Sequence, residues 1–495
     1  MRNIIDKNAL DITILRDAFP YQKDAFEEIK DLPYSAIFHE QGLGKTKIAV
    51  DLIAYWLESR DIDTVLVVTK KQLVANWDRE LFFHLGVHPA KLTSSAAKNY
   101  YVMTSTARIV VTNFETVVSE LDRLKLYLDT RAVAIIIDES AKIKNPETRV
   151  AQALFELSSK FKIRNIMTGT PIANRPYDIW SQIYFLDHGK SLGTDFEEFK
   201  AKTNLSNDLG KDFRKQEEFV DAVGSIFESI SSFSVRETKE SGLTVTLPSK
   251  TIHDIPVDFE PLQEVMYEQV RTDMCIVVQQ GDQSIFDDSS SSLKRMNRLL
   301  EIASSPSIID DSYDRVSGKE KVLDELLNEV ASRGEKCIVW SSFTHNIDRF
   351  TSKYSSRSTV KVHGGMSMEA RNRSVSDFQD GDATILFATP QAAKEGLTLT
   401  AANNAIFYDR GFNLDDYLQA QDRIHRISQK RECHIYNLIM RGSIDVWISK
   451  LLNAKRNAAA LGQGDISADE YDRIADYTYC GLVKDVLGFE ESIHE

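Results

Sequence analysis

The chain has 495 residues, which is too long for one ordinary hydrophobic core and indicates two or three domains. Hydrophobic residues make up 42% of it, so packed cores are expected and a largely disordered chain is excluded. The 60 basic and 74 acidic residues give a formal net charge of −14, which argues against non-specific coating of nucleic acid or membrane but leaves room for a local basic groove.

The N-terminus has no apolar signal-peptide core, and no apolar run reaches the ~18 residues that a membrane span needs. The four cysteines are scattered and form no C-x-x-C pair, so the sequence suggests neither a zinc site nor a disulfide framework. We therefore expect a cytosolic protein without a membrane partner.

The first half of the chain alternates short β-branched runs with amphipathic helices. The expected strands are residues 35–40, 64–70, 108–116, 132–140 and 163–171. Continuous apolar strands between polar turns are typical of strands buried on both faces, which predicts a parallel sheet covered by helices.

The alternation is lost between residues 190 and 315, where charged helical stretches and the serine run "DDSSSS" predict helices joined by a flexible loop. It returns in a second set of expected strands: 336–343, 358–365, 383–390, 404–411 and 432–439. We therefore predict an α/β fold of two parallel-sheet lobes in tandem. The predicted ranges are lobe 1 at 1–235 with a helical C-terminal part, a helical connector or insertion at 236–315, lobe 2 at 316–455 and a helical tail at 456–495.

The segment "HEQGLGKT", residues 39–46, lies between a predicted strand and a predicted helix, as a phosphate-binding loop does. It departs from the common pattern G-x-x-x-x-G-K-[ST], because His39 stands at the first glycine position. Lys45 would reach the β- and γ-phosphates and Thr46 would hold magnesium. Backbone N–H groups would converge on phosphate oxygens at the helix N-terminus, from Gly42, Leu43 and Gly44. The alternative is a chance Gly-Lys-Thr in a loop.

Two adjacent acids, Asp138 and Glu139, end a buried apolar strand. The carboxyl ends of such strands face the crevice where ligands bind in α/β sheets. One carboxylate would hold magnesium through water, and the next would orient and deprotonate the attacking water. The alternative is a solvated acidic turn, which the joint occurrence with the phosphate loop disfavours.

Arg423 and Arg426 lie three residues apart in "QAQDRIHRISQ", so on a helix they would share one face. Arginines far along the chain from the phosphate loop suit an arginine finger that the second lobe supplies. Taken alone, the two arginines are better explained as part of an ordinary charged helix face.

Together these segments resemble the Swi/Snf-type branch of superfamily two helicases, which are ATP-driven double-stranded DNA translocases, over residues 15–450. "HEQGLGKT" resembles the family loop "DEMGLGKT", which has no glycine where His39 stands. "DESAKIKN" resembles "DEAHRIKN", "MTGTPIANRPYDIWSQIYFL" resembles the segment that begins "LTGTPIQN", and "QAQDRIHRISQ" resembles the last motif of the family.

The resemblance implies two RecA-like lobes that close around ATP and Mg²⁺, with Gln22 of "FPYQKDA" at the adenine and closure coupled to movement along DNA. Residues implied in that coupling are Thr168, Gly169, Thr170, Gly396 and Gln419. Turns after the strands would hold nucleic-acid phosphates, through Lys70, Thr112, Asn113, His363, Gly364 and Thr389. For each of these except Lys70, a capped turn with a purely structural role is an equal alternative.

The sequence departs from the family pattern at several places. Ser140 and Ala141 stand where Ala-His is common, which puts in doubt how the ATP state is communicated. Lys394, Thr398, Phe412 and Ser428 also replace common residues, which leaves the details of the DNA contact open.

The resemblance implies an ATP hydrolase that acts on double-stranded DNA, or on branched or forked DNA. Alternatives are a strand-separating or branch-migrating helicase and the motor subunit of a phage or bacterial defence or replication-repair complex, whose protein partner supplies nuclease or targeting function. A non-enzymatic interaction module with a degenerate nucleotide site is disfavoured, because the candidate catalytic residues are all present: Lys45, Asp138, Glu139, Arg423 and Arg426. Because no chromatin-reading domain is recognisable, we expect a bacterial or viral protein in the cytoplasm, and a nuclear one only in a eukaryote.

Overall fold

The computed structural model describes residues 12–59, 61–172, 175–204, 213–239, 248–279, 289–393, 399–426 and 429–462. The chain divides into two compact units. Unit 1 consists mainly of Met1–Asn207 and Glu217–Thr246, and unit 2 mainly of Leu247–Leu461.

Unit 1 is built on a seven-stranded sheet in the order β3-β4-β2-β5-β6-β1-β7, with every neighbouring pair parallel. The strands are β1 (Tyr34–Ile37), β2 (Thr64–Thr69), β3 (Ala90–Lys91), β4 (Ile109–Asn113), β5 (Val133–Asp138), β6 (Ile163–Met167) and β7 (Ser234–Val235). All six residues of β2 are buried, because helices cover both faces of the sheet.

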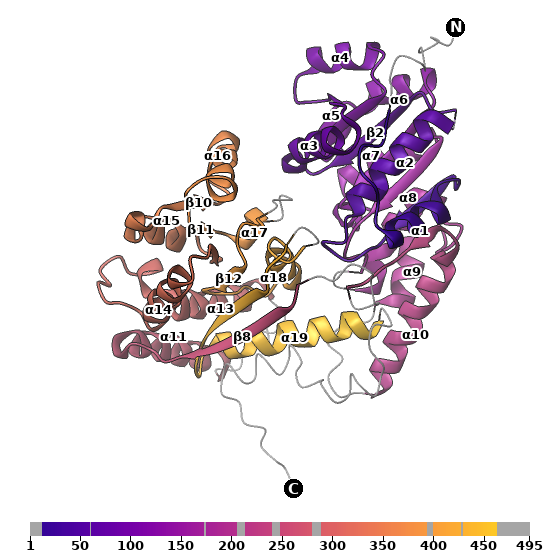
Figure 1. The fold of residues 1–495 in the computed structure, drawn as a ribbon. Coiled ribbons are helices and arrows are strands. Elements are labelled where there is room, and N and C mark those ends of the chain that lie inside the picture. The colour runs from indigo at the N-terminus through magenta and orange to yellow at the C-terminus, as the bar shows by residue number, and fades with distance from the viewer. Residues whose placement is uncertain are drawn as a thin grey trace. The chain divides into compact units, whose positions relative to one another are not determined.

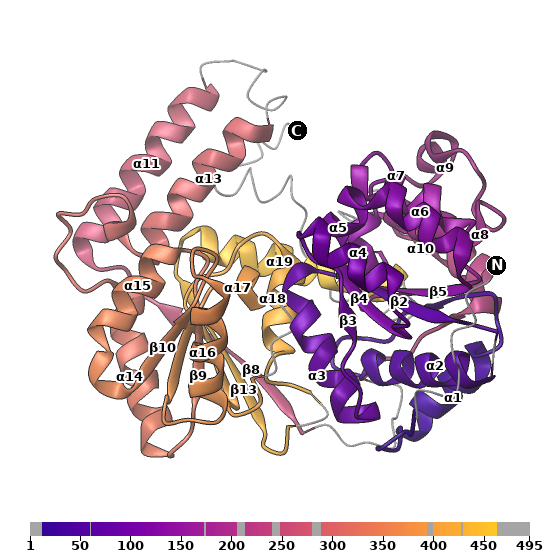
Figure 2. The same cartoon turned by 90° about the horizontal axis from the view of Figure 1, so that it is seen from above.

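The helices of unit 1 fall into two layers. In Figure 2, α1, α2 and α3 lie on one face of the sheet and α5, α6, α7 and α8 on the other. Their bounds are α1 (Pro20–Ile29), α2 (Lys45–Ser59), α3 (Val74–Leu85), α4 (Ala96–Thr104), α5 (Phe114–Ser119), α6 (Leu121–Thr130), α7 (Arg149–Ser158), α8 (Trp180–Asp187), α9 (Phe196–Thr203) and α10 (Phe213–Ile230). Helix α2 is largely enclosed, and its Ile48, Leu52 and Trp56 are fully buried.

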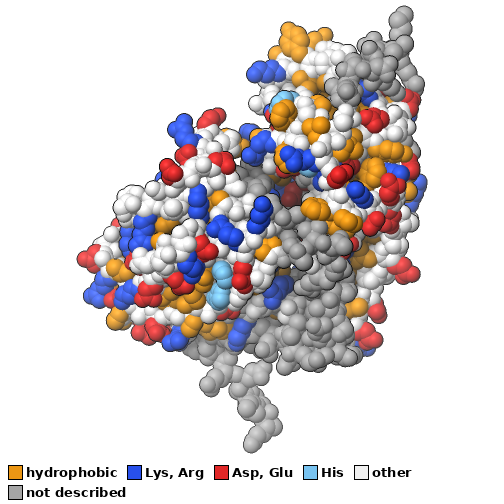
Figure 3. All heavy atoms as spheres, viewed as in Figure 1, with side chains coloured by type: hydrophobic (Ala, Val, Ile, Leu, Met, Phe, Trp, Pro, Cys, Tyr) orange, Lys and Arg blue, Asp and Glu red, His pale blue; other side chains and the backbone are white. Residues whose placement is uncertain are grey.

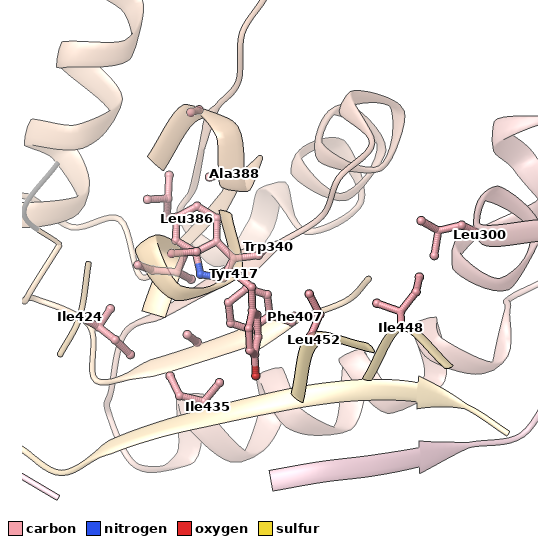
Figure 4. Packing of buried hydrophobic residues seen from close by; sticks show 14 of the residues in the cluster. Leu300, Trp340, Leu386, Ala388, Phe407, Tyr417, Ile424, Ile435, Ile448 and Leu452 are labelled. Atoms are coloured by element: carbon pink, nitrogen blue, oxygen red, sulfur yellow. The ribbon is translucent and has the colours of Figure 1, made fainter. Parts of the chain in front are cut away.

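Unit 2 has a six-stranded parallel sheet in the order β10-β11-β9-β12-β13-β8. The strands are β8 (Lys250–Val257), β9 (Cys337–Trp340), β10 (Thr359–Val362), β11 (Ile385–Ala388), β12 (Asn404–Phe407) and β13 (Cys433–Met440). Figure 4 shows the core on one face of this sheet, where Trp340, Phe407 and Ile435 from three strands meet Ile448 and Leu452.

The helices of unit 2 are α11 (Pro261–Gln279), α13 (Ser289–Ser304), α14 (Gly318–Ser332), α15 (Thr344–Lys353), α16 (Met368–Gln379), α17 (Pro390–Ala393), α18 (Leu414–Gln421) and α19 (Ile444–Gly462). The helices α11 and α13 lie side by side in Figures 1 and 2. Tyr267 of α11 and Leu299 of α13 belong to the same buried core as the strands, so both helices are part of unit 2.

Each of the ten expected strands corresponds to one strand of the structure, and the predicted α/β fold of two parallel-sheet lobes is confirmed. Three strands were not expected: β3, β7 and β8. The segment 236–315, expected as a helical connector, contains β8, which pairs with β13 along its whole length (Figure 1). Exposed and partly buried residues alternate along β8, and Pro256 has no backbone N–H to donate to a neighbouring strand. Both features are typical of an edge strand. The strands that the sequence predicted are instead continuous apolar runs.

Two other expectations are resolved only in part. The serine run was expected as a loop, but Ser289–Ser292 form the first turn of α13, and this part of the expectation is wrong. Most of the expected tail at 456–495 lies outside the described residues, and α19 extends to Gly462. Within the described part of the chain, no helix has the length and apolar character that crossing a membrane requires.

Candidate nucleotide-binding site

The predicted phosphate loop connects β1 to α2. Gly42 and Gly44 have φ values of 87° and 69°, in the left-handed region that glycine adopts without steric cost. The ammonium of Lys45, the first residue of α2, donates hydrogen bonds to the carbonyl oxygens of His39 (2.9 Å) and Glu40 (3.3 Å). The Lys45 side chain therefore folds back onto the first residues of the loop, and Thr46 follows it in the first turn of α2.

Gln22 of α1 is buried and contacts the phosphate loop. Its Nε2 donates to the carbonyl oxygens of Leu43 (3.1 Å) and Gly44 (3.4 Å), and its Oε1 accepts from the backbone N–H of Phe19 at 3.0 Å. The hydroxyl of Tyr21 donates to the same Leu43 carbonyl at 2.9 Å. Gln22 thus holds the loop through the carbonyl oxygens of Leu43 and Gly44. Recognition of adenine by its amide stays a prediction.

His39 stands where the common loop pattern has its first glycine. Its side chain is only 2% exposed, and its ring lies 6.0 Å from the ring of Tyr21. Burial, together with the positive charge of Lys45, lowers the pKa of the imidazole to about 4. The side chain is therefore a neutral packing group at pH 7, and the loop accommodates it without a glycine.

Asp138 ends β5 and is held by two donors. Its Oδ2 accepts hydrogen bonds from the hydroxyl of Thr69 (2.9 Å) and from the indole Nε1 of Trp77 (2.8 Å). Removal from water and the adjacent charge of Glu139 raise the pKa of the Asp138 carboxyl, while the donors and Lys45 oppose that rise. A cation bound nearby would favour the ionised carboxylate, which burial and the charge of Glu139 disfavour.

Glu139 has a left-handed backbone, with φ 58° and ψ 50°, which is uncommon for a residue other than glycine and is often found at functional sites. Its Oε2 lies 3.4 Å from Nζ of Lys70. The sequence placed Lys70 among the nucleic-acid contacts, whereas the structure places it beside the second acid.

The segment after β6 contacts the phosphate loop. The backbone N–H of Thr168 donates to the carbonyl of Ile37 at 3.1 Å, and the Thr168 hydroxyl accepts from the N–H of Thr170 at 3.3 Å. A Cβ added to Gly169 would lie 2.7 Å from Cγ of Gln41. Of the three residues predicted for coupling in unit 1, Gly169 therefore lies against the loop, whereas Thr168 contacts the end of β1 and Thr170 contacts Thr168.

A buried polar contact that the sequence did not reveal involves Ser140. Its hydroxyl donates to Oε1 of Gln182 at 2.7 Å, and Nε2 of Gln182 donates to the carbonyl of Pro171 at 3.0 Å. Gln182 is fully buried in α8. The one signal in the sequence was a glutamine, next to a serine, inside the largely apolar run "IWSQIYFL".

The remaining candidates for nucleic-acid contact have local partners. Thr112 is fully buried, and the Asn113 side chain caps α5 by accepting from the N–H of Thr116 at 2.9 Å. His363 accepts at Nδ1 from the N–H of Gly365 and lies 3.5 Å from Asp348. Gly364 is exposed, and Thr389 lines a pocket of about 460 Å³ in unit 2. The contacts of Asn113 support the alternative given for it, a capping residue with a structural role.

The two predicted arginines belong to unit 2. Their expected placement on one helix face is wrong, because α18 ends at Gln421 and both arginines lie in the turns that follow. The carbonyl of Arg423 accepts a hydrogen bond from the N–H of Leu399, a residue distant in the chain, at 3.1 Å. Arg423 is 2% exposed, whereas Arg426 is half-buried with its Nε on the carbonyl of Asp422.

The last two residues predicted for coupling also belong to unit 2. Gln419 is buried in α18, and Gly396 lies outside the described residues.

Comparison with known families agrees with this geometry. Residues 34–308 match the SNF2-related domain, and residues 318–428 match the helicase conserved C-terminal domain. The chain belongs to the SNF2-related family. The predicted resemblance to Swi/Snf-type ATPases is thereby confirmed, and the two matched domains correspond largely to the two units.

Similar proteins come from several organisms. The "Putative ATP-dependent helicase/translocase YwqA" of Bacillus subtilis is 27% identical over 473 residues, covering 88% of this chain and 48% of the relative. An uncharacterized ATP-dependent helicase of Mycoplasma pneumoniae is 27% identical over 451 residues, covering 88% of this chain and 41% of that protein. The chain thus spans less than half the length of these relatives.

Among solved structures, the Sulfolobus solfataricus SWI2/SNF2 ATPase core in complex with dsDNA aligns with a TM-score of 0.42 at 24% identity. The alignment covers 94% of this chain and 98% of that one.

Proposed function

We propose that this chain is an ATP-driven motor that moves along double-stranded DNA. The observation that carries the proposal is the arrangement in unit 1, where the phosphate loop with Lys45 and the acids Asp138 and Glu139 follow parallel strands of one sheet. In an SNF2-related chain this is the machinery of phosphoryl transfer. The relatives named as an ATP-dependent helicase/translocase and an ATP-dependent helicase support the same proposal.

ATP is proposed to bind with its phosphates on the loop. The N–H groups of Gly42, Leu43 and Gly44 and the ammonium of Lys45 would neutralise the phosphate charge. Lys45 now donates to two loop carbonyls, so it would exchange these acceptors for phosphate oxygens.

Magnesium is proposed to bind through the Thr46 hydroxyl and, through water, Asp138. Hydroxyl and carboxylate oxygens are the donors that Mg²⁺ prefers, and it usually takes only one or two of them from the protein, with phosphates and waters completing the shell. The ion would supply charge neutralisation at the β- and γ-phosphates.

Glu139 is proposed to orient the attacking water and accept its proton. Asp138 is fixed by Thr69 and Trp77, which leaves the catalytic proton transfer to the neighbouring acid. Arg423 and Arg426 are proposed to stabilise charge on the transferring phosphoryl group when unit 2 comes together with unit 1. Closure that depends on the γ-phosphate, and release after hydrolysis, would convert turnover into movement along DNA.

Because the chain is acidic overall, contact with DNA phosphates would depend on local groups of Lys and Arg side chains. Figure 3 shows both basic (Lys, Arg) and acidic (Asp, Glu) side chains over the described surface on the face that it displays. The deciding experiment measures ATP turnover without nucleic acid and with single-stranded DNA, duplex DNA, forked DNA and RNA. A triplex-displacement assay then reports movement on duplex, and a strand-displacement assay reports unwinding.

We expect duplex DNA to stimulate turnover and the third strand to be displaced without separation of the duplex. Efficient strand separation would instead favour the helicase alternative. Equal turnover with and without every nucleic acid at low salt would contradict the proposal.

A further inference from the structure

Two consecutive residues at the end of β2 contact the two consecutive acids at the end of β5. The hydroxyl of Thr69 donates to Asp138, and the ammonium of Lys70 lies 3.4 Å from Oε2 of Glu139. The strands are parallel neighbours in which Val68 pairs with Ile137, so their carboxyl ends bring these residues to one edge of the sheet. The register of the sheet, and not a loop, therefore sets the pairing.

The Lys70–Glu139 pair is partly enclosed. The side chain of Glu139 is 14% exposed and that of Lys70 is 25% exposed. An ion pair in such a position is screened less by salt than one on the open surface. Together with the left-handed backbone at Glu139, the contact fixes the direction in which the carboxylate points.

We infer that Lys70 is a positioning residue for Glu139 and that phosphates of the nucleic acid compete with Glu139 for its ammonium. The inference rests on the proposed function, in which Glu139 accepts the proton of the attacking water. A carboxylate oxygen held by an ammonium is a weaker proton acceptor and is directed away from other partners. A phosphate oxygen that engages Lys70 releases the carboxylate, so one side chain links DNA binding to activation of the water.

The part of Lys70 that reaches solvent makes this competition possible. A lysine ammonium is a mobile point charge on a flexible stem with three donors, so it can exchange one anionic partner for another without a backbone change. A purely structural ion pair would stabilise the fold without any response to DNA, and a pure DNA ligand would change affinity without changing turnover in the absence of DNA.

The test compares three variants with the parental chain. Lys70→Met keeps the length of the side chain and removes the charge, and Lys70→Arg keeps the charge. Lys71→Met is the matched control, because Lys71 is exposed in the adjacent short helix Lys71–Leu73 and has no resolved partner in the site. Melting temperatures of all variants establish that they fold, and Lys70→Gln replaces Lys70→Met if the latter does not.

Without nucleic acid, we expect Lys70→Met to hydrolyse ATP ~3- to 10-fold faster than the parental chain, the factor that loss of one partly enclosed ion pair gives. At saturating duplex DNA the two should differ little, so the stimulation ratio falls by a similar factor. Lys70→Arg and Lys71→Met should keep the parental ratio. Lys70→Met should also lower the slope of log affinity against log salt by ~0.9, the effect of one lost phosphate contact.

Unchanged or slower turnover of Lys70→Met without nucleic acid, in a background where the parental enzyme responds to DNA, would overturn the inference. A parental enzyme that hydrolyses ATP but ignores every nucleic acid contradicts the proposed function instead. In that case the turnover of Lys70→Met without nucleic acid still decides the positioning role of Lys70.

Discussion

The hydroxyl of Ser140 donates a 2.7 Å hydrogen bond to Oε1 of Gln182, which joins the residue after the two acids to the middle of α8. Gln182 in turn donates to the carbonyl of Pro171, in the segment that follows β6. Both side chains are fully buried. A polar connection therefore runs between the acids and the segment predicted for coupling, at the place where the chain lacks the histidine common in its family.

Removal of either partner should be costly. Ser140→Ala leaves Oε1 of Gln182 buried without its donor, which should lower the free energy of unfolding by ~1–3 kcal/mol. Gln182→Leu should cost at least as much, because the carbonyls of Pro171 and Asp178 also lose a donor. Urea unfolding of both single variants and the double variant checks this. Strict additivity in the double variant would show that the two side chains do not act as a pair.

Lys45→Ala and Glu139→Gln should both stop ATP turnover, by different routes. Lys45→Ala removes charge from the phosphate loop, so nucleotide affinity should fall as well. Glu139→Gln keeps the shape of the side chain but removes the proton acceptor, so ATP should bind normally and turn over ~10²-fold or more slowly. Nucleotide binding by fluorescence and steady-state turnover separate the two routes. Parental turnover in Glu139→Gln would remove Glu139 from the mechanism.

Arg426→Lys tests the contribution of unit 2. If Arg426 is an arginine finger, turnover should fall by ~10³-fold, since lysine lacks the planar fork that spreads charge over the phosphoryl group. Because Arg426 is half-buried, the free energy of unfolding should change by no more than ~0.5 kcal/mol. Arg423→Lys is expected to slow turnover too, but Arg423 is 2% exposed, so its stability must be measured alongside. Near-parental turnover in both variants would exclude the finger role.

Lys319 of α14 and Asp445 of α19 form an ion pair in unit 2 whose side chains are 0% and 4% exposed. Lys319→Met leaves the buried carboxylate without its counter-charge and should lower the free energy of unfolding by ~3–5 kcal/mol. Lys321→Met, at an exposed position of the same helix, should change it by less than ~0.5 kcal/mol. Equal stability of the two variants would mean that the pair contributes nothing.

His39 should make stability depend on pH. Its pKa is lowered to about 4 in the folded chain, so the unfolded chain binds a proton first as the pH falls. The contribution of neutral His39 is therefore complete above the ordinary histidine pKa of ~6.5 and is lost progressively between that pH and about 4. Over this range, the parental chain should lose on the order of 2 kcal/mol more than His39→Phe does. Parallel pH profiles of the two chains would contradict this assignment.

The sequence predicted those parts of the fold that have a local signal. Each buried strand appeared as a continuous apolar run, and the phosphate loop appeared as a glycine pattern between a strand and a helix. β8 gave no such run, because only one of its edges is paired and its residues alternate between exposed and half-buried. A shared helix face for Arg423 and Arg426 would need a helix beyond Gln421, but α18 ends there and the Arg423 carbonyl accepts from the N–H of Leu399, a contact distant in the chain.

The unpredicted parts of the site depend on which strands are neighbours. Lys70 and Glu139 are 69 residues apart in the chain, and only the adjacency of β2 and β5 brings them together. Gln182 is 42 residues from Ser140, and neither a serine nor a glutamine indicates by its type which residue it will contact. Chemistry read from a motif was therefore predictable, whereas the contacts that restrain that chemistry required the structure.

The close approach of Gly169 to Gln41 leaves no room for even a methyl group, since a Cβ at that position would lie 2.7 Å from the Gln41 side chain. The phosphate loop and the segment after β6 are thus packed so closely that a shift of one requires a shift of the other. If nucleotide pushes Gln41, we expect residues 168–171 to follow, and the Pro171 carbonyl would then pull on Gln182 and Ser140. The residue next to Ser140 is Glu139, so we expect a change at the bound phosphate to reach, through these neighbouring contacts, the acid that is proposed to activate the attacking water.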